Sequence, residues 1–284
     1  MIIDKINKWL TENTGHEDAR LVYSIEKLAG YSFHRQFMEA KESGRKGKLY
    51  ISAAGKCARQ VAYGYHGIEK NGKEIDSRAN IIFWQGDMAE LMLMALAKAA
   101  GCNITATGFE QLRVEIPLIT ISKVTEESDT EEKISVSGYG DGILLQDKEI
   151  YLVEAKSYAS YSYERFEKGD VDEAYIAQIN LYMDAHGLNK CILVAMNKDN
   201  GVLGERLIMK DEAVVMAAKD NLISVAMSTI EEMPKQKYEV NEKGFYPWQC
   251  LYCAWHGVCL PDAEKVLVSK SYRLKKIKVK ETKI

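Results

Sequence analysis

The sequence contains little proline and no long hydrophobic segment. Only four of its 284 residues are proline, and the densest apolar stretch, residues 91–97, ends at Lys98. A transmembrane helix needs about 20 consecutive apolar residues, so we expect none in this chain. The N-terminal residues also lack the basic and then apolar order of a signal peptide. We therefore expect a cytoplasmic protein that does not enter a membrane.

An excess of charge of either sign is also absent. The chain has 38 Lys and Arg against 41 Asp and Glu, which gives a formal net charge of −3. This balance provides no overall attraction to nucleic acid, but local basic patches matter more than the total. Two basic stretches stand out, at residues 41–59 and 270–283. Each is interpreted either as a solvated surface or as a contact for a phosphate backbone.

Hydrophobic periodicity predicts an order of helices and strands that is typical of an α/β fold. Helices are expected over residues 1–42 (with breaks at Gly15 and Gly30), 52–67, 81–100, 171–186 and 211–232. Strands are expected over residues 111–121, 134–145 and 149–156, as an antiparallel meander, and then over 190–196 and 202–209. Glycine follows two of the predicted helices directly, at Gly101 and Gly187, which favours helix ends at these points.

Charged residues at two predicted strand ends carry the first functional indication. Glu154 and Lys156 end one strand, and because side chains alternate between faces, they emerge on the same side of the sheet. Asp141 ends the preceding strand. If the two strands form a hairpin, Asp141 and Glu154 can converge on one divalent cation, with Lys156 beside the water it activates. Two carboxylates and a lysine suit metal-assisted phosphodiester hydrolysis, although such residues also occur at strand ends by chance.

Two further features strengthen this hypothesis. Gln178 and Tyr182 are four residues apart on a predicted helix, so they share one face, which can look toward the strand ends. Glu90 interrupts an otherwise apolar helix, where a buried carboxylate needs a partner and a metal ion would supply one. The alternative for Glu90 is a surface position on an imperfect helix.

The ordered set Gly86-x3-Glu90, Asp141, Glu154-x-Lys156 and Gln178-x3-Tyr182 resembles the RecB-like branch of the PD-(D/E)XK nucleases. The resemblance covers roughly residues 80–200. It implies an α/β core with a mixed sheet flanked by helices, and Mg²⁺ or Mn²⁺ held by Glu90, Asp141 and Glu154. It also implies that Lys156 orients the nucleophile and that Gln178 and Tyr182 lie beside the site. Many family members have histidine at the position of Glu90.

Four of the six cysteines form a separate pattern. Cys250-x2-Cys253-x5-Cys259 is compact enough for one metal centre, and Cys57 is the natural fourth ligand. Disulfides are rare in cytosolic proteins, so a zinc site and an iron–sulfur cluster are the open alternatives, and the spacing favours neither. The remaining two, at positions 102 and 191, are expected to be buried packing residues.

One early cysteine followed by Cys-x2-Cys-x5-Cys near the end resembles the iron–sulfur members of the same nuclease group. These include the CRISPR-associated adaptation nucleases, the AddB-type nuclease domains and stand-alone phage exonucleases. The resemblance implies a 4Fe-4S cluster on Cys57, Cys250, Cys253 and Cys259 that clasps the fold. Trp248 and Trp255 flank the ligands and are interpreted either as a hydrophobic cover or as base-stacking residues.

Together these resemblances imply three parts: an N-terminal helical segment with the first cysteine (1–79), a nuclease core (80–233) and a C-terminal iron–sulfur segment with a basic tail (234–284). The implied activity is metal-dependent cleavage of DNA, preferably single-stranded, by an exonuclease. Recombination proteins or CRISPR integrase proteins are possible partners, because an adaptation factor that trims spacer precursors is one alternative. The other is a zinc-stabilised DNA-binding protein whose nuclease site is idle.

Overall fold

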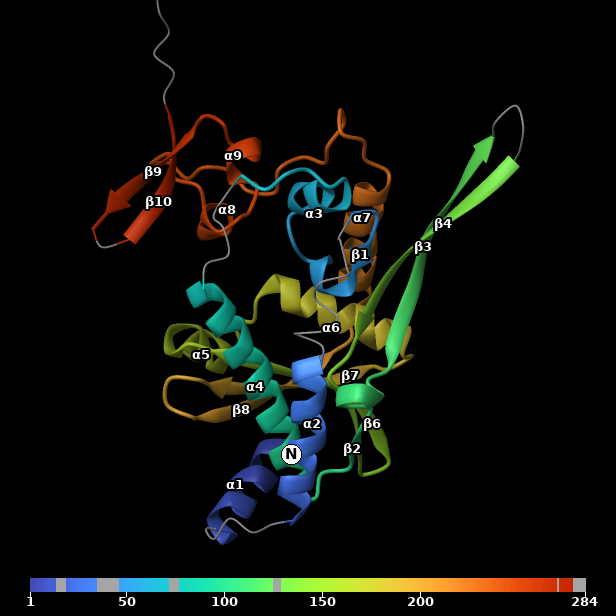
Figure 1. Ribbon diagram of the computed structural model, residues 1–284, viewed down its shortest axis with the longest axis vertical. Helices are drawn as coiled ribbons and strands as arrows, with labels where there is room; N and C mark the ends of the chain where they lie inside the picture. Colours follow the sequence, from blue (N-terminus) through green and yellow to red (C-terminus); the bar gives the residue numbers. More distant parts are fainter. Residues whose placement is uncertain (14–18, 35–45, 72–76, 125–128, 270, 278–284) are drawn as a thin grey trace, which may run out of the picture. The chain divides into compact units, whose positions relative to one another are not determined.

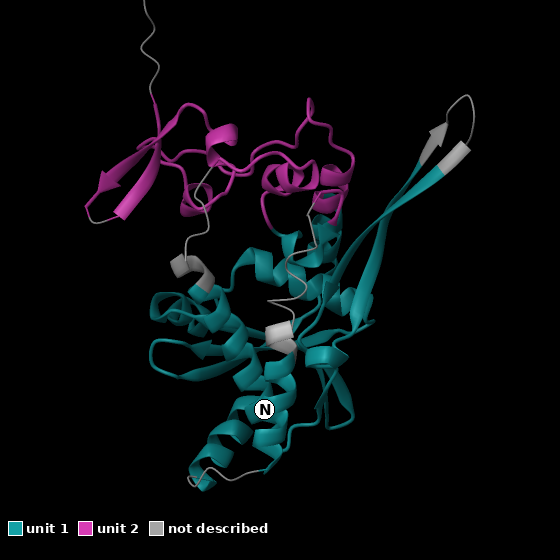
Figure 2. Ribbon diagram, in the orientation of Figure 1, with its two compact units in different colours: residues 1–44, 49–55, 77–220 teal, residues 45–48, 56–76, 221–284 magenta. Residues whose placement is uncertain are grey.

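The computed structural model describes residues 1–13, 19–34, 46–71, 77–124, 129–269 and 271–277 (Figure 1). The chain divides into two compact units, each assembled from separate stretches of sequence (Figure 2). Unit 1 comprises residues 1–44, 49–55 and 77–220, and unit 2 comprises residues 45–48, 56–76 and 221–284. The segment around Cys57 therefore belongs to the same unit as the C-terminal cysteines. None of the described helices is both long and apolar enough to cross a membrane.

Unit 1 is built on a five-stranded mixed sheet. Its strand order is β2 (Ile104–Thr105), β5 (Gly142–Gln146), β6 (Glu149–Tyr158), β7 (Lys190–Asn197) and β8 (Leu203–Met209). Only β6 and β7 are parallel, and the chain between them forms α5 (Ser160–Glu167) and α6 (Glu173–Ala185). A parallel pair requires such a crossover connection. The predicted α/β class, with a mixed sheet flanked by helices, is confirmed.

Helices cover both faces of this sheet. On one face, α1 (Ile2–Glu12), α2 (Ala19–His34) and α4 (Ser77–Ala99) join Val153 and Ala155 in one apolar core. Because neighbouring residues of a strand point to opposite faces, Glu154 and Lys156 point to the other face. That face is covered by α6, whose Gln178 contacts Glu154. The site residues of β6 therefore lie under α6, away from the α4 side of the sheet.

The predicted meander is wrong at one point. The run 134–145 is not one strand but two, β4 (Asp129–Tyr139) and β5, separated at Gly140 and Asp141. β4 pairs with β3 (Arg113–Val124) and β1 (Leu49–Tyr50) in a second, three-stranded sheet. At Gly140 a side chain would meet Leu152 at 3.2 Å, so glycine lets the chain cross tightly from one sheet to the other.

Glycine ends the two helices where it was predicted to do so. Gly101 (φ +77°) follows α4, and Gly187 (φ +65°) follows α6, both in the left-handed region that favours glycine. Cys102 N–H donates to Ala97 O at 2.9 Å and Leu188 N–H donates to Met183 O at 2.8 Å, which closes each helix end. Asp172 caps the start of α6 by accepting from Ala174 N–H at 2.8 Å.

Three predicted helices have different bounds in the structure. The expected break at Gly30 is absent, because this glycine lies inside α2. The helix expected from Ser52 begins only at Ala58, as α3 (Ala58–Tyr65), after a short 3₁₀ turn at Ile51–Ala53. The last long helix, α7 (Glu212–Ala226), ends before the predicted residue 232. A second 3₁₀ turn, at Gly108–Glu110, precedes β3.

Unit 2 has small cores of its own. It contains α3, α8 (Trp248–Leu251), α9 (His256–Cys259) and a hairpin of β9 (Ala263–Val268) and β10 (Ser271–Lys276), which the sequence patterns did not predict. Trp255 packs with Tyr63 and donates from Nε1 to Ile68 O at 2.9 Å, which joins the Cys57 stretch to the C-terminal stretch. Of the two basic stretches, residues 41–45, 270 and 278–283 lie outside the described residues.

A close contact between β4 and α6 provides a test of this packing. A side chain at Gly138 would meet the Tyr182 hydroxyl at 2.6 Å and Ile51 at 3.1 Å. Gly138→Ala should therefore lower the free energy of unfolding by about 1–3 kcal/mol, as overpacking does. Adding Tyr182→Phe removes the nearest atom and should recover part of the loss relative to Tyr182→Phe alone, measured by denaturant unfolding.

The control is Gly30→Ala in α2, where a new side chain would meet nothing within 4 Å. Alanine favours helix more than glycine does, so this variant should be as stable as the parent or slightly more stable. A Gly138→Ala variant that unfolds like the parent would contradict the observed contact between β4 and α6.

Candidate active site and cysteine pocket

The β5–β6 hairpin places Asp141 beside Glu154. The strands pair antiparallel, with Gly142 opposite Val153. One residue beyond this pair, Asp141 therefore comes opposite Glu154. The connection is the two-residue turn Asp147–Lys148, and both residues have positive φ (53° and 66°), as in a type I′ hairpin turn. The hairpin predicted from the sequence is thus confirmed.

Asp141 is fixed by a hydrogen bond to the neighbouring strand. Its Oδ2 accepts from the backbone N–H of Ala155 at 2.8 Å, and the carboxylate is buried. Glu154, one residue earlier on β6, is 1% exposed. Two carboxylates are therefore held at adjacent positions in the interior, where charge is costly unless it is compensated.

The two oxygens of Glu154 have different surroundings. Oε1 accepts from Lys156 Nζ, and it also accepts from Gln178 Nε2 at 2.7 Å. Oε2 is buried and has no hydrogen-bond partner among the described residues. Buried polar atoms are nearly always paired, so an unpaired carboxylate oxygen marks a position where a further ligand fits. A divalent cation, which binds carboxylate oxygens, matches this position.

The electrostatics of the site also favour a cation. Burial, and then the nearby Asp141 carboxylate, raise the pKa of Glu154 to about 7, while Lys156 opposes the shift. The pKa of Lys156 is raised, because Glu154 and Asp141 outweigh the effect of its burial, so the lysine stays charged. One ammonium faces two carboxylates, and a further positive charge would relieve the remaining repulsion between them.

Lys156 is held on three sides. Besides Glu154, it donates to the carbonyl oxygen of Ala155 at 3.1 Å, and its Nζ lies 5.2 Å from the centroid of the Tyr175 ring. Its side chain is only partly buried, so the ammonium lies between the buried carboxylates and solvent. This is a suitable place for a cation that holds a reacting water or phosphate oxygen.

The two predicted residues of α6 occupy different places. Gln178 contacts Glu154 directly, as described above. Tyr182 is buried against β4, where its hydroxyl lies over Gly138 and is hydrogen-bonded to the backbone of Tyr139. Burial raises the pKa of Tyr182, so its hydroxyl remains protonated. The geometry therefore gives Gln178 a position at the carboxylate and Tyr182 a position in the packing behind it.

Tyr158 was not singled out in the sequence, although it lies near the site. It follows Lys156 by two residues on the same face of β6, and its ring lies 6.3 Å from that of Tyr175. The Tyr158 hydroxyl is buried without a hydrogen-bond partner in the described part of the chain. The period-two pattern Glu154, Lys156, Tyr158 was the sequence signal that could have identified it.

Glu90 is half-buried on α4, the helix that packs on the sheet face opposite Glu154, and one turn earlier Gly86 faces Ser157. Within the described ranges, no group of three or more His, Cys, Asp or Glu side chains is arranged to hold a metal ion. The structure thus brings Asp141, Glu154, Lys156 and Gln178 together, and the role of Glu90 as a third ligand stays a prediction.

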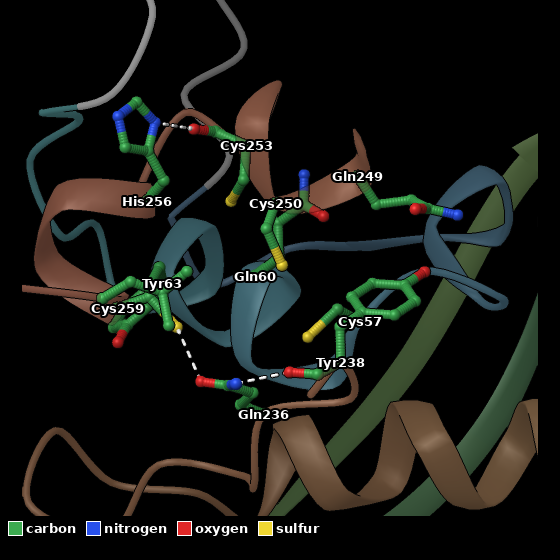
Figure 3. Close-up of a pocket in the computed structure, with 11 residues that line it drawn as sticks. Cys57, Gln60, Tyr63, Gln236, Tyr238, Gln249, Cys250, Cys253, His256 and Cys259 are labelled. Atoms are coloured by element: carbon green, nitrogen blue, oxygen red, sulfur yellow. Dashed lines mark hydrogen bonds between the residues drawn. The ribbon is translucent and has the colours of Figure 1, made fainter. Parts of the chain in front are cut away.

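The predicted cluster cysteines line one pocket of unit 2. Cys57 caps the start of α3, Cys250 lies in α8, Cys253 follows it, and Cys259 ends α9 (Figure 3). All four are free thiols. His256 also lines the pocket, but its Nδ1 donates to the carbonyl oxygen of Cys253 at 3.0 Å. Two stretches far apart in sequence therefore contribute thiols to one cavity.

The thiols of this pocket are electrostatically coupled. Burial, and then the charges of the other three cysteines, raise the pKa of Cys250 to about 12. Burial also raises the pKa of Cys253 and Cys259, although Arg59 beside Cys259 opposes the shift. Without a cation these thiols remain protonated, and a bound metal centre would stabilise their thiolate forms.

The two tryptophans beside these ligands differ. Trp255 is buried against Tyr63 and Cys253, as expected of a hydrophobic cover. Trp248 is exposed at the start of α8. Cys102 and Cys191 are buried in unit 1, as predicted, and are not among the residues that line the pocket.

No family model matches the chain. No curated protein matches it either. Among solved structures, the chain is similar to SSO0001 (18% identity, TM-score 0.49, covering 80% of this chain and 92% of that one). It is also similar to an alkaline exonuclease, LHK-Exo, from Laribacter hongkongensis (17% identity, TM-score 0.44, covering 66% and 93%), and to LHK-Exo in complex with dAMP (18%, 0.42, covering 64% and 89%). At these values the likeness assigns neither a family nor an activity.

Proposed function

We propose that this protein is a metal-dependent deoxyribonuclease that hydrolyses phosphodiester bonds, most readily at the ends of single-stranded DNA. The observation that carries the proposal is the surroundings of Glu154. Its carboxylate is buried, with one oxygen bonded to Lys156 and Gln178 and the other unpaired. Asp141 is fixed beside it through Ala155 N–H. Such an arrangement is costly for a purely structural role but suits a site for Mg²⁺ or Mn²⁺.

Each residue of the site has a role that follows from its contacts. A divalent cation on Glu154 and Asp141 would lower the pKa of water and neutralise charge on a phosphate. Gln178 orients the Glu154 carboxylate by donating a hydrogen bond to Oε1. This leaves Oε2 without a partner among the described residues and open to a cation. Lys156 stays protonated and partly exposed, so it can hold the attacking oxygen or a phosphate oxygen. Glu90 is proposed as an additional ligand only through the resemblance described above.

The choice of DNA, and of linear single strands, rests on the resemblance of the motif set to RecB-like nucleases. The residues themselves indicate phosphodiester hydrolysis and no particular polarity. The same resemblance supports recombination or CRISPR integrase proteins as partners.

The decisive assay follows the loss of end-labelled linear and circular single-stranded DNA with Mg²⁺ or Mn²⁺. We expect the parent protein to degrade the linear substrate alone. Glu154→Gln, Asp141→Asn and Lys156→Gln should each reduce cleavage at least about 100-fold, because each removes a charge from the site. Glu149→Gln is the matched control, since this exposed glutamate lies on the same strand and pairs with Lys190 instead.

Cleavage of circular DNA would show that the protein is an endonuclease and would contradict the proposed exonuclease activity, because a circle has no ends. If the three site variants cut DNA as well as the parent does, the activity comes from elsewhere or from a contaminant. If the parent, with its metal content intact, cuts neither substrate, the idle-site alternative is favoured.

We further propose that Cys57, Cys250, Cys253 and Cys259 hold a 4Fe-4S cluster with a structural role. The four thiols share one pocket, and burial, followed by the other three cysteines, raises the pKa of Cys250, so a cationic centre would stabilise its thiolate. Both a zinc ion and a 4Fe-4S cluster accept four thiolates, and the choice of the cluster rests on the spacing of the cysteines, which resembles that of the iron–sulfur nucleases.

Metal and acid-labile sulfide analysis of an anaerobic preparation tests the cluster. We expect iron and sulfide in the parent, with a visible absorption band that disappears in Cys250→Ser. Loss of the clasp should also lower the thermal stability of unit 2. Cys102→Ala, at a buried cysteine outside the pocket, is the control and should keep the iron. Zinc without sulfide in the parent would reject the cluster and support the zinc-stabilised alternative.

A further inference from the structure

Unit 2 contains a second cavity, distinct from the cysteine pocket. It has a volume of about 540 Å³ and is lined by α8, β10 and the loop 239–247. This volume is within the range of sites that hold small organic molecules. Five of its thirteen lining residues are aromatic, namely Phe245, Tyr246, Trp248, Tyr252 and Tyr272, and Arg273 lies among them.

The aromatic side chains of this cleft are unusually exposed. Trp248 is 57% exposed, Tyr252 is 61% exposed and Tyr272 is 59% exposed. Trp248 and Tyr252 lie four residues apart, and their ring centroids are 6.4 Å from each other in an edge-to-face arrangement. Large aromatic side chains left in solvent around one cavity indicate a binding surface rather than a core.

Arg273 lines the cleft, and Lys275 lies two residues further along β10, beside the lining residue Phe245. Arg273 and Lys275 alternate along β10 and both approach the Phe245 ring, at 5.8 and 5.7 Å from its centroid. The backbone holds this arrangement, because Phe245 bridges to Lys275 and Tyr246 N–H donates to Leu274 O at 2.9 Å. In the part of the chain that the structure describes, neither cation is paired with a carboxylate.

We propose that this cleft binds unpaired nucleobases of a single-stranded nucleic acid. Trp248, Tyr252 and Tyr272 offer faces on which bases stack, and Arg273 and Lys275 offer charges for the adjoining phosphates. The proposal rests on the proposed function in that it gives the nuclease a strand-binding site in unit 2. It requires no cleavage, however, and can be tested alone.

The composition of the cleft favours nucleic acid over a protein partner. A protein-docking groove of this size would be expected to have an apolar floor with its charges paired across the interface. Here two cations lie against the Phe245 ring, and exposed aromatic side chains line the same cleft. Glu239, from the loop 239–247, also lines the cleft and provides an acceptor for base amino groups.

The test is fluorescence anisotropy of a labelled thymidine oligonucleotide in EDTA, where no metal-dependent cleavage occurs. We expect the parent to bind it more tightly than a duplex, whose bases are not available for stacking. The double variant Trp248→Ala, Tyr252→Ala should bind the oligonucleotide about tenfold more weakly or worse, because each substitution removes a ring on which a base stacks. Tyr161→Ala is the control, since Tyr161 is an exposed tyrosine of α5 (75%).

The salt dependence provides a second, independent readout. Each phosphate contact to a single strand contributes about 0.7 to the slope of log affinity against log salt. The double variant Arg273→Gln, Lys275→Gln should therefore reduce this slope by about 1.4, twice the contribution of one contact. Lys168→Gln, at an exposed lysine outside the cleft, should leave the slope unchanged.

Equal affinity of the parent and the aromatic double variant for the oligonucleotide would overturn the proposal. So would equal affinity of the parent for duplex and single strand, because the bases would then play no part. The Glu154→Gln variant separates this inference from the proposed function. If this variant binds the oligonucleotide as the parent does, and the parent cuts no DNA, the binding proposal is supported and the proposed nuclease activity is rejected.

Discussion

The buried carboxylate of Glu154 is the constraint on which the rest of unit 1 depends. It is 1% exposed, and one of its oxygens has no partner among the described residues. The neighbouring structure is arranged around it, because the hairpin turn sets the register of Asp141, α6 supplies Gln178, and Lys156 closes the site toward solvent. A carboxylate in such surroundings lowers the stability of the fold, and the apolar layer of α1, α2 and α4 on the opposite face offsets that cost.

Unit 2 depends on a different constraint, the convergence of thiols from distant parts of the sequence. Cys57 at the start of α3 joins Cys250, Cys253 and Cys259 in one pocket, and Trp255 packs against Cys253 and Cys259. A small unit with little core of its own benefits from a metal centre that links its segments. The same short elements that present the cysteines also present Trp248 and Tyr252 on their outer side. A metal centre bound by these cysteines would therefore stabilise the fold of unit 2 and also fix the residues of the cleft that we propose for nucleobases.

Sequence reasoning was most successful where the signal is local. Glycines at 101 and 187 end helices as expected, and the alternation of Glu154 and Lys156 places both on one face. It failed where the outcome depends on distant contacts. The run 134–145 looks continuous in sequence, but the chain passes from one sheet to the other at Gly140 and Asp141. Gly140 packs closely against Leu152, and Asp141 accepts a hydrogen bond from Ala155 N–H. Likewise, β10 has a charged, tail-like sequence, and its strand forms only through pairing with β9 and the bridge to Phe245. The sequence also did not indicate that α4, the helix that carries Glu90, packs on the sheet face opposite Glu154.

The most direct test of the account is a crystal structure of the protein grown with Mn²⁺, with the ion located by its anomalous scattering. The account predicts an anomalous peak at Glu154 Oε2 and the Asp141 carboxylate, with Gln178 and Lys156 still bonded to Oε1. The same map shows whether Glu90 contributes a ligand. A structure in which Glu154 Oε2 is hydrogen-bonded to protein or water, with manganese absent from it, would contradict the central claim that this buried oxygen is a metal ligand.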